Sequence, residues 1–285
     1  MLDLPITTEK ERAAVSMEAW QIKFRKVTDD APIGVIKILE PRRLFAELRP
    51  MDAANVLAEA TPMAHDSFTI VWIPPGTKAS VSVERDLENW VRDGEVAGDR
   101  TPVRAGVRTV RVIWTFSRAL IYASQENIGS ALNAVVRFTV AHLEVSALES
   151  EMDSTWVAIE RDAPLTHSIT ARQLGLQPHV DALTVTAIGM KTAFLRVTRA
   201  LEQLDPSLED SSKRIYAELV LASALYDRLE LLEDPVQFAL EHYEMANTRL
   251  SEARVAYKEQ RRATISHALE AVIILLLLYP LHLFW

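Results

Sequence analysis

The feature of this chain that most limits how it can fold is an apolar run close to its C-terminal end. The run begins at Ala271, contains four consecutive leucines and continues through Tyr279-Pro280. Such a run must be removed from water, in a membrane or in the interior of a protein or an assembly. We expect a membrane anchor made by these residues: Ala271, Ile273, Ile274, Leu276, Leu278 and Trp285.

The length of the run determines where the membrane boundary can lie. The fifteen residues from Ala271 would span roughly 22 Å as a helix, against a hydrocarbon layer of roughly 30 Å. A start at Ile265 would give about 31 Å. His267 and Glu270 would then lie at or inside the boundary, where ionisable groups need partners or lipid headgroups. A helix buried in a protein core or an oligomer interface is the alternative for so short a run.

Basic residues precede the apolar run: Arg254, Lys258, Arg261 and Arg262. Positive flanks favour the cytosolic side of a membrane. We therefore expect a single-pass protein whose soluble part faces the cytosol or, in a mitochondrion, the matrix. The net charge of -8 and the scattered cations argue against direct nucleic-acid binding, which needs concentrated positive charge.

Before about Ile128 the rest of the chain has strand-like segments with a few helices, and after it long helical patterns replace the strands. This order predicts the α+β class. We expect an α+β domain over residues 1–125, a helical domain over 126–262 and the anchor over 263–285. In the first domain, a small mixed sheet is predicted with a turn at Pro74-Pro75-Gly76. Its expected strands are Ile33–Leu39, Phe68–Ile73, Ser80–Glu84, Val107–Thr115 and Ala119–Ala123, and its expected helices are Glu9–Lys26 and Met51–Ala60.

An antiparallel helical hairpin is predicted in the second domain. Apolar residues recur at steps of four and three over Ile215, Leu219, Ala222, Tyr226 and Leu229, which is typical of a buried helical face. Asp234 and Pro235 then have the chemistry of a helix start, because aspartate caps helix N-termini and proline is favoured at the first helical position. The hairpin turn should therefore precede Pro235.

The helix after this turn carries a heptad pattern. One row has Val236, Tyr243, Leu250 and Tyr257, and a second row has Ala239, Ala246 and Ala253. Alanine on one row lets a neighbouring backbone approach closely. We expect this seam to pack against its hairpin mate or, as an alternative, against another subunit.

No familiar catalytic constellation occurs in the sequence. Phosphate-binding glycine loops, the G-x-S-x-G elbow and the H-E-x-x-H zinc motif are all missing, and the chain has no cysteine. His142 and Glu149 share a helical face, yet two ligands leave a metal site incomplete. Alternating arginines could bind an anion or simply face solvent: Arg104, Arg108 and Arg111. We therefore expect no enzyme, no cofactor and no metal.

The last third resembles the required-for-meiotic-nuclear-division family, also called the Sif2/Sif3 type, mainly over residues 188–278. The similar pieces are Leu232-Glu233-Asp234-Pro235 with Phe238, Asn247-Thr248-Arg249-Leu250, and Leu269-Glu270 leading to Ile273-Ile274. Ala246 stands where the family usually has leucine. The resemblance implies a non-catalytic protein anchored in the mitochondrial inner membrane or a bacterial membrane, with mitochondrial members supporting organellar translation.

A coarser likeness is to CorA-type magnesium channels, which also place an α/β domain before long helices that lead into a membrane. The Gly-Met-Asn motif and a second span are missing here, and Gly189-Met190-Lys191 does not match that motif. We expect a membrane-tethered scaffold or adaptor that binds protein partners or itself through its C-terminal helices. A subunit of an oligomeric ion channel or transporter is the alternative.

Overall fold

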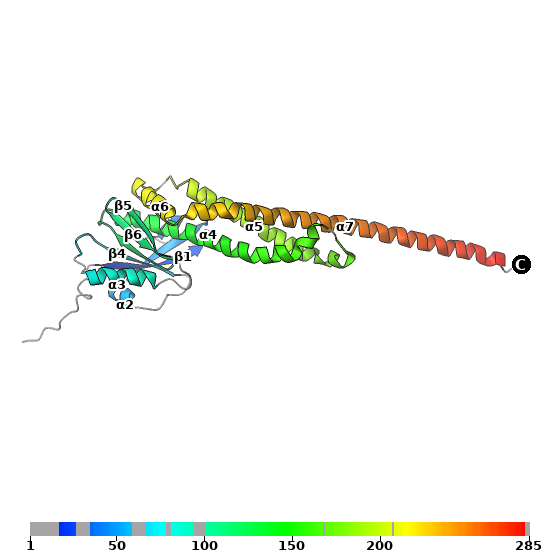
Figure 1. Cartoon of the computed structure of the whole chain (residues 1–285), viewed down its shortest axis with the longest axis horizontal. Coiled ribbons are helices and arrows are strands. Elements are labelled where there is room, and N and C mark those ends of the chain that lie inside the picture. Colours follow the sequence, from blue (N-terminus) through cyan, green and yellow to red (C-terminus); the bar gives the residue numbers. More distant parts are fainter. Residues whose placement is uncertain are drawn as a thin grey trace, which may run out of the picture. The chain divides into compact units, whose positions relative to one another are not determined.

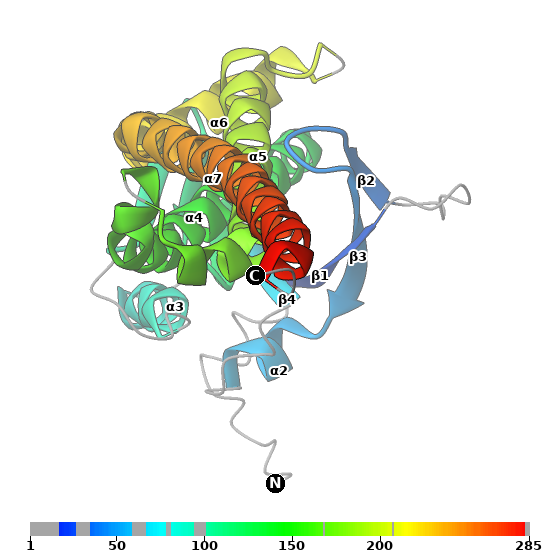
Figure 2. The same ribbon diagram turned by 90° about the vertical axis from the view of Figure 1, so that its right-hand side faces the viewer.

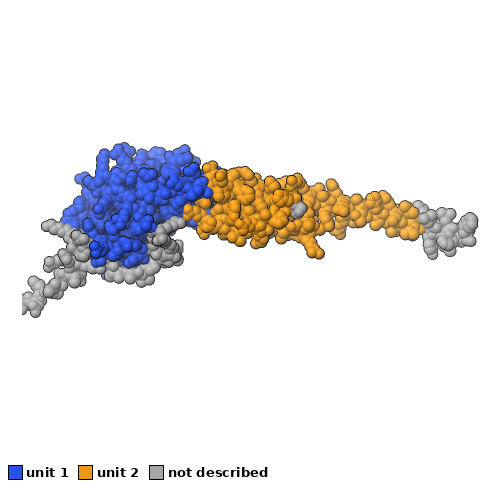
Figure 3. All heavy atoms as spheres, in the orientation of Figure 1, with its two compact units in different colours: residues 1–148, 193–231 blue, residues 149–192, 232–285 orange. Residues whose placement is uncertain are grey.

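The computed structural model describes residues 17–26, 35–58, 67–77, 81–93, 101–167, 169–206 and 208–282. The chain divides into two compact units, shown in Figure 3. Unit 1 comprises residues 1–148 and 193–231, and unit 2 comprises residues 149–192 and 232–285. Since both units draw on segments that follow residue 125, this division does not test the predicted domain limits, which stay a prediction.

Unit 1 contains a seven-stranded mixed sheet with the strand order β2-β3-β1-β4-β7-β6-β5. Strands β1, β4, β5 and β6 of this sheet are labelled in Figure 1. The central strands β4 and β7 pair in parallel, and the other neighbours pair antiparallel. The strands are β1 (Glu18–Lys26), β2 (Val35–Ile38), β3 (Leu44–Met51), β4 (Ser67–Ile73), β5 (Val103–Val107), β6 (Val110–Trp114) and β7 (Arg118–Tyr122). The predicted α+β class with a mixed sheet is confirmed.

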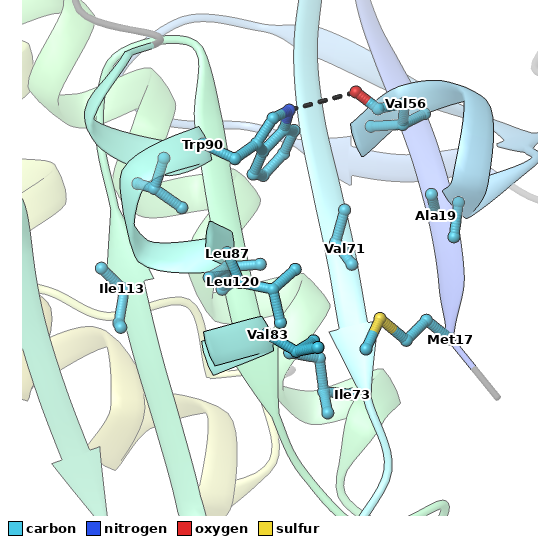
Figure 4. Packing of buried hydrophobic residues seen from close by; sticks show 12 residues of the cluster. Met17, Ala19, Val56, Val71, Ile73, Val83, Leu87, Trp90, Ile113 and Leu120 are labelled. Carbon is cyan, nitrogen blue, oxygen red and sulfur yellow. Dashed lines mark hydrogen bonds between the residues drawn. The ribbon is translucent and has the colours of Figure 1, made fainter. Parts of the chain in front are cut away.

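Helices cover both faces of this sheet. On one face, α2 (Ala53–Ala58), which follows β3 (Figure 2), and α3 (Val81–Arg92) enclose a cluster that includes Val71, Leu87 and Leu120 (Figure 4). On this face Trp90 Nε1 donates to the Val56 carbonyl at 3.1 Å. On the other, Trp114 Nε1 donates to Thr139 Oγ1 of α4 (Ile128–Asp162) at 2.9 Å. Burial on both faces explains why the central strands are almost entirely apolar.

The remaining elements are helical. They are the short 3-10 helices η1 (Ala163–Thr166) and η2 (Ala171–Leu176), then α5 (Gln177–Glu202), α6 (Asp210–Ala222) and α7 (Leu225–His282). Helix α7 has 58 residues. Helices α4, α5 and α7 each contribute residues to both units.

Several predicted elements are confirmed within a few residues. They are β2, β4, β6, β7, α2 and the start of α4. The predicted turn at Pro74-Pro75-Gly76 is also present: the Thr77 amide donates to the Pro74 carbonyl at 3.3 Å, and Gly76 has a φ of 90°. Glycine suits this position because a side chain would be strained at positive φ.

Two predictions in unit 1 are wrong. The end of the expected helix Glu9–Lys26 is strand β1, while residues 9–16 lie outside the described residues. Here the β1 backbone is paired on both sides, with β3 and with β4, and Ile22 is fully buried between them. The expected strand Ser80–Glu84 falls on α3 from residue 81, because Val83 and Leu87 belong to a helical apolar row that continues to Trp90.

The helix start predicted at Asp234-Pro235 is also wrong. Helix α6 ends before Ala224, which has a φ of 50°, and α7 then runs through Pro235 without ending. The apolar face predicted from Ile215 to Leu229 is therefore divided between α6 and α7. Proline removes the hydrogen bond to the carbonyl four residues earlier, at Leu231, and that residue is exposed. Water can satisfy the carbonyl, so the helix continues.

Candidate functional site

The heptad residues of α7 lie in the core of unit 2. Five of them are fully buried: Val236, Ala239, Tyr243, Ala246 and Leu250. Ala253 is half-buried and Tyr257 is exposed. The part of the seam that is covered by this chain therefore ends near Leu250.

The helices that pack on this seam are α4 and α5 of the same chain. Thr184 Oγ1 of α5 lies 3.5 Å from the carbonyl oxygen of Tyr243, and the Gln177 amide donates to the Asn247 side chain. From α4, the Trp156 ring lies 5.7 Å from the Phe238 ring. A side chain of α5 reaches the α7 backbone because the neighbouring seam positions are alanines. In sequence these partners are distant from the seam, unlike the adjacent hairpin mate that we expected.

Beyond Leu250, α7 has no partner among the described residues. From residue 251 to residue 275 every side chain except Ala253 is exposed. The hydrogen bonds and ion pairs of this stretch all lie within α7, such as Thr264 to the Gln260 carbonyl at 2.9 Å. We call residues 251–282 the terminal segment of α7 (Figure 1).

The terminal segment changes chemistry along its length. Its first half is charged, and both Arg261 and Arg262 are exposed. Its second half exposes aliphatic side chains by about half or more: Ile265, Leu269, Val272, Ile273, Ile274 and Leu275. Ala271 is also exposed. Of the other expected anchor residues, Leu276 and Leu278 lie on α7 outside the described side chains, and Trp285 lies outside the described residues.

One pair of ionisable groups interrupts the aliphatic half. His267 Nδ1 lies 3.4 Å from Glu270 Oε2, and the two side chains are 79% and 64% exposed. The spacing of three residues places both groups on the same side of the helix. The structure thus brings together the two polar residues expected at the membrane boundary.

Among the residues whose side chains the structure describes, one helical stretch is long and apolar enough to cross a membrane, at Ile128–Thr166. It lies in mid-chain, and 67% of its apolar window is buried inside the structure. Val135, Phe138 and Ala141 of α4 are all fully buried. This is the burial typical of a core helix in a soluble fold.

A polar cluster lies within unit 2 beside the seam. Asp162 Oδ2 lies 2.9 Å from His179 Nε2, and Asp162 Oδ1 accepts from Arg161 Nε at 3.0 Å. Burial raises the pKa of Asp162, but the bonds to Arg161 and His179 outweigh it and hold the pKa below its usual value. Burial lowers the pKa of His242, and it raises the pKa of Tyr243 to about 12. This cluster around the buried Asp162 was not predicted, since Asp162, His179 and Tyr243 are far apart in sequence.

Three other side chains singled out in the sequence, His142, Arg104 and Arg111, have structural partners. His142 packs 4.6 Å from the Trp114 ring, and Arg228 Nη1 lies 2.8 Å from its Nε2 atom. Arg104 pairs with Glu88 at 2.9 Å, and Arg111 lies over the Tyr122 ring at 4.6 Å. Within the described residues no group of three or more His, Asp or Glu is arranged to hold a metal ion.

Comparison with known proteins gives little further guidance. No protein family matches the sequence, and no curated protein matches it. The chain is similar to a solved structure described as the structure of the full-length CmaX protein, with 12% sequence identity, a TM-score of 0.29, and coverage of 78% of this chain and 76% of that chain. Because this TM-score is low, the likeness supports no conclusion about fold or function. The resemblance to the meiotic-nuclear-division family stays a prediction.

Proposed function

We propose that this protein is a membrane-tethered, non-enzymatic scaffold whose anchor is the terminal segment of α7. The observation that supports this most directly is the row of exposed aliphatic side chains from Ile265 to Leu275 on a helix without a partner. Contiguous exposed apolar surface of this kind is unfavourable in water and marks a membrane or protein contact. An isolated helix is also only marginally stable in water.

The dimensions of the terminal segment fit a bilayer. Residues 265–282 remain helical and would extend about 27 Å at 1.5 Å per residue, close to a hydrocarbon thickness of about 30 Å. Arg261 and Arg262 lie immediately before this stretch, where they would contact the headgroups. Unit 1 and the packed part of unit 2, up to about residue 250, would then face the cytosol or the mitochondrial matrix. The inner membrane of a mitochondrion or a bacterium is the proposed location.

Exposed apolar side chains also occur on the packed part of unit 2. Val185 and Ile188 lie on one side of α5, and Phe238 and Met245 recur at a heptad interval on α7. Each is about half exposed or more. Apolar side chains exposed in this way are suited to binding a second copy of the chain or a protein complex, such as the translation machinery implied by the family resemblance. The proposed activity is therefore binding.

Carbonate extraction of the native membrane tests the anchor. We expect the intact chain to stay in the membrane pellet, and the double substitution Ile273→Asp with Ile274→Asp to release it. The matched control is Val255→Asp with Tyr257→Asp, which places the same two charges on exposed apolar residues of the same helix, but outside the apolar half. Release of the wild-type chain would contradict the proposal.

A second candidate function, a subunit of an oligomeric ion channel or transporter, is favoured by the His267–Glu270 pair. Ionisable groups within an apolar helix commonly line an aqueous path, and several copies of one span could enclose such a path. Ion flux into liposomes would be expected to fall with Glu270→Gln and to be unchanged with the exposed control Glu259→Gln. A monomer or dimer in detergent would count against this function.

A further inference from the structure

Unit 1 contains a cavity of about 420 Å³ that is separate from the terminal segment of α7. It is enclosed by the β2–β3 connection, α4, the end of α5, the segment that follows it and α6. This volume is in the range of small-molecule sites, which run from about 300 to about 1,000 Å³. The ionisable residues of its lining are Glu40, Arg43, Arg137, Arg199, Asp205 and Tyr216.

Three arginines from three different elements converge on this cavity. Arg137 of α4 is largely buried, and its guanidinium is already occupied: it pairs with Asp205 at 3.2 Å and donates to the Lys37 carbonyl at 3.0 Å. Arg137 therefore fixes the wall of the cavity.

Arg43 and Arg199, by contrast, have no ion-pair or hydrogen-bond partner among the described residues. Arg43 belongs to the β2–β3 connection and Arg199 to the last turn of α5. Each guanidinium offers planar donors that match the oxygens of a phosphate or carboxylate group. The cavity thus presents two available cations at its exposed rim.

A hydroxyl lies deeper in the same cavity. Tyr216 of α6 is 5% exposed, and its hydroxyl has no hydrogen-bond partner among the described residues. Burial raises the pKa of Tyr216, so the group stays protonated and can donate at neutral pH. The lining of the cavity carries three arginines and two carboxylates, Glu40 and Asp205, so its net charge is +1.

We propose that this cavity binds a small oxyanion-bearing molecule, whose phosphate or carboxylate group is held by Arg43 and Arg199 and accepts a hydrogen bond from Tyr216. Apolar side chains complete the lining and would contact an uncharged part of the ligand: Leu39, Leu204 and Leu208. Such a ligand would bind the displayed part of the protein, independently of whether α7 enters a membrane.

Isothermal titration of the full chain in detergent, with pyrophosphate and with citrate at matched ionic strength, tests the proposal and distinguishes the two ligand classes. We expect saturable binding of at least one probe. Arg43→Gln and Arg199→Gln should each weaken it about tenfold or more, because hydrogen bonds to charged groups are among the stronger ones. Tyr216→Phe, which removes only the donor, should weaken it less.

The matched control is Arg172→Gln, which removes the same charge from an exposed arginine of unit 2 and should leave binding unchanged. Equal loss with Arg172→Gln would overturn the proposal, since it would show attraction by overall charge. The proposal would also be overturned if neither pyrophosphate nor citrate bound. Thermal melting of each variant would show that the fold is retained, so that a loss of binding reports on the cavity.

Discussion

His242 illustrates how a single buried group can set the pH response of unit 2. It is 7% exposed, and its Nε2 atom has no hydrogen-bond partner among the described residues. Burial lowers the pKa of His242 in the folded state. The unfolded chain, with a histidine pKa of about 6.5, then binds more protons than the folded chain below that pH, so stability falls as the pH drops through this window.

We expect the melting temperature to be lower at pH 5.5 than at pH 7.5, and the difference to shrink in His242→Gln. The carboxyl of Asp162 contributes in a different window, because its lowered pKa means that its stabilisation is lost only as the pH falls below about 4. His267→Gln, at an exposed position, is the control and should keep the wild-type difference. A difference that survives in His242→Gln would assign the effect to another group.

A second residue-scale prediction concerns Ala224, between α6 and α7, where φ is 50°. The left-handed region is unfavourable for a residue with a Cβ atom, whereas glycine adopts it freely. Ala224→Gly should therefore raise the free energy of unfolding by up to about 1 kcal/mol, after the added flexibility of the unfolded chain is taken into account. Urea unfolding in detergent, followed by tryptophan fluorescence, measures this.

The control for that experiment is Ala217→Gly, at an exposed position inside α6. There the backbone is helical, so glycine should lower the free energy of unfolding by about 1 kcal/mol. The two substitutions should thus have opposite signs. Destabilisation by both would show that the conformation of Ala224 is not strained in solution.

At the scale of elements, the alanine row of α7 determines how closely its neighbours approach. Ala246 is fully buried where α7 packs in unit 2. Ala246→Leu should lower stability by about 1–3 kcal/mol, since extra methylenes in a packed core force side chains and backbone apart. Ala263→Leu, at an exposed position of the same helix, should change stability by less than about 0.5 kcal/mol. Thermal melting of the two variants measures these changes in stability. Equal changes for Ala246→Leu and Ala263→Leu would contradict the prediction and show that the seam is loosely packed.

Elements were predictable from the sequence where local pattern and tertiary packing agree. Strands β4 and β7 are continuous apolar runs because they are buried on both faces, and their positions follow from that composition. We predicted a helix for strand β1 because charged residues lie beside its apolar ones, as in an amphipathic helix. Trp20, Ile22 and Phe24 nevertheless alternate with polar residues, as strand residues do. The helix start predicted at Pro235 was wrong for a similar reason. Proline favours the first position of a helix, but buried residues on either side of Pro235 keep α7 continuous there.

The candidate sites were predictable only in part, for a related reason. The anchor and the seam are continuous in sequence, so periodicity reveals them. By contrast, the cavity in unit 1 draws its arginines from positions 43, 137 and 199, and the cluster around Asp162 joins the end of α4 and the start of α5 to α7. Only the tertiary fold brings such residues together.

At the scale of the whole molecule, the remaining question is which surface joins copies of the chain. The exposed residues Val185 and Ile188 of α5 lie on one side of the helix, at a spacing of three residues. Burying them in a neighbouring copy would remove from water an apolar surface that the single chain leaves exposed. We therefore predict that the detergent-solubilised protein is at least a dimer by light scattering, and that Val185→Glu with Ile188→Glu shifts it toward the monomer.

Because both side chains are exposed, this double substitution should leave the thermal unfolding of the separated chain nearly unchanged. Thr248→Glu with Ser251→Glu, at exposed polar positions of α7, introduces the same two charges and should preserve the assembly. If wild-type chains were monomeric, or if the α5 variant kept the wild-type mass, this face would have to be covered by a different protein. The scaffold would then act through a partner alone.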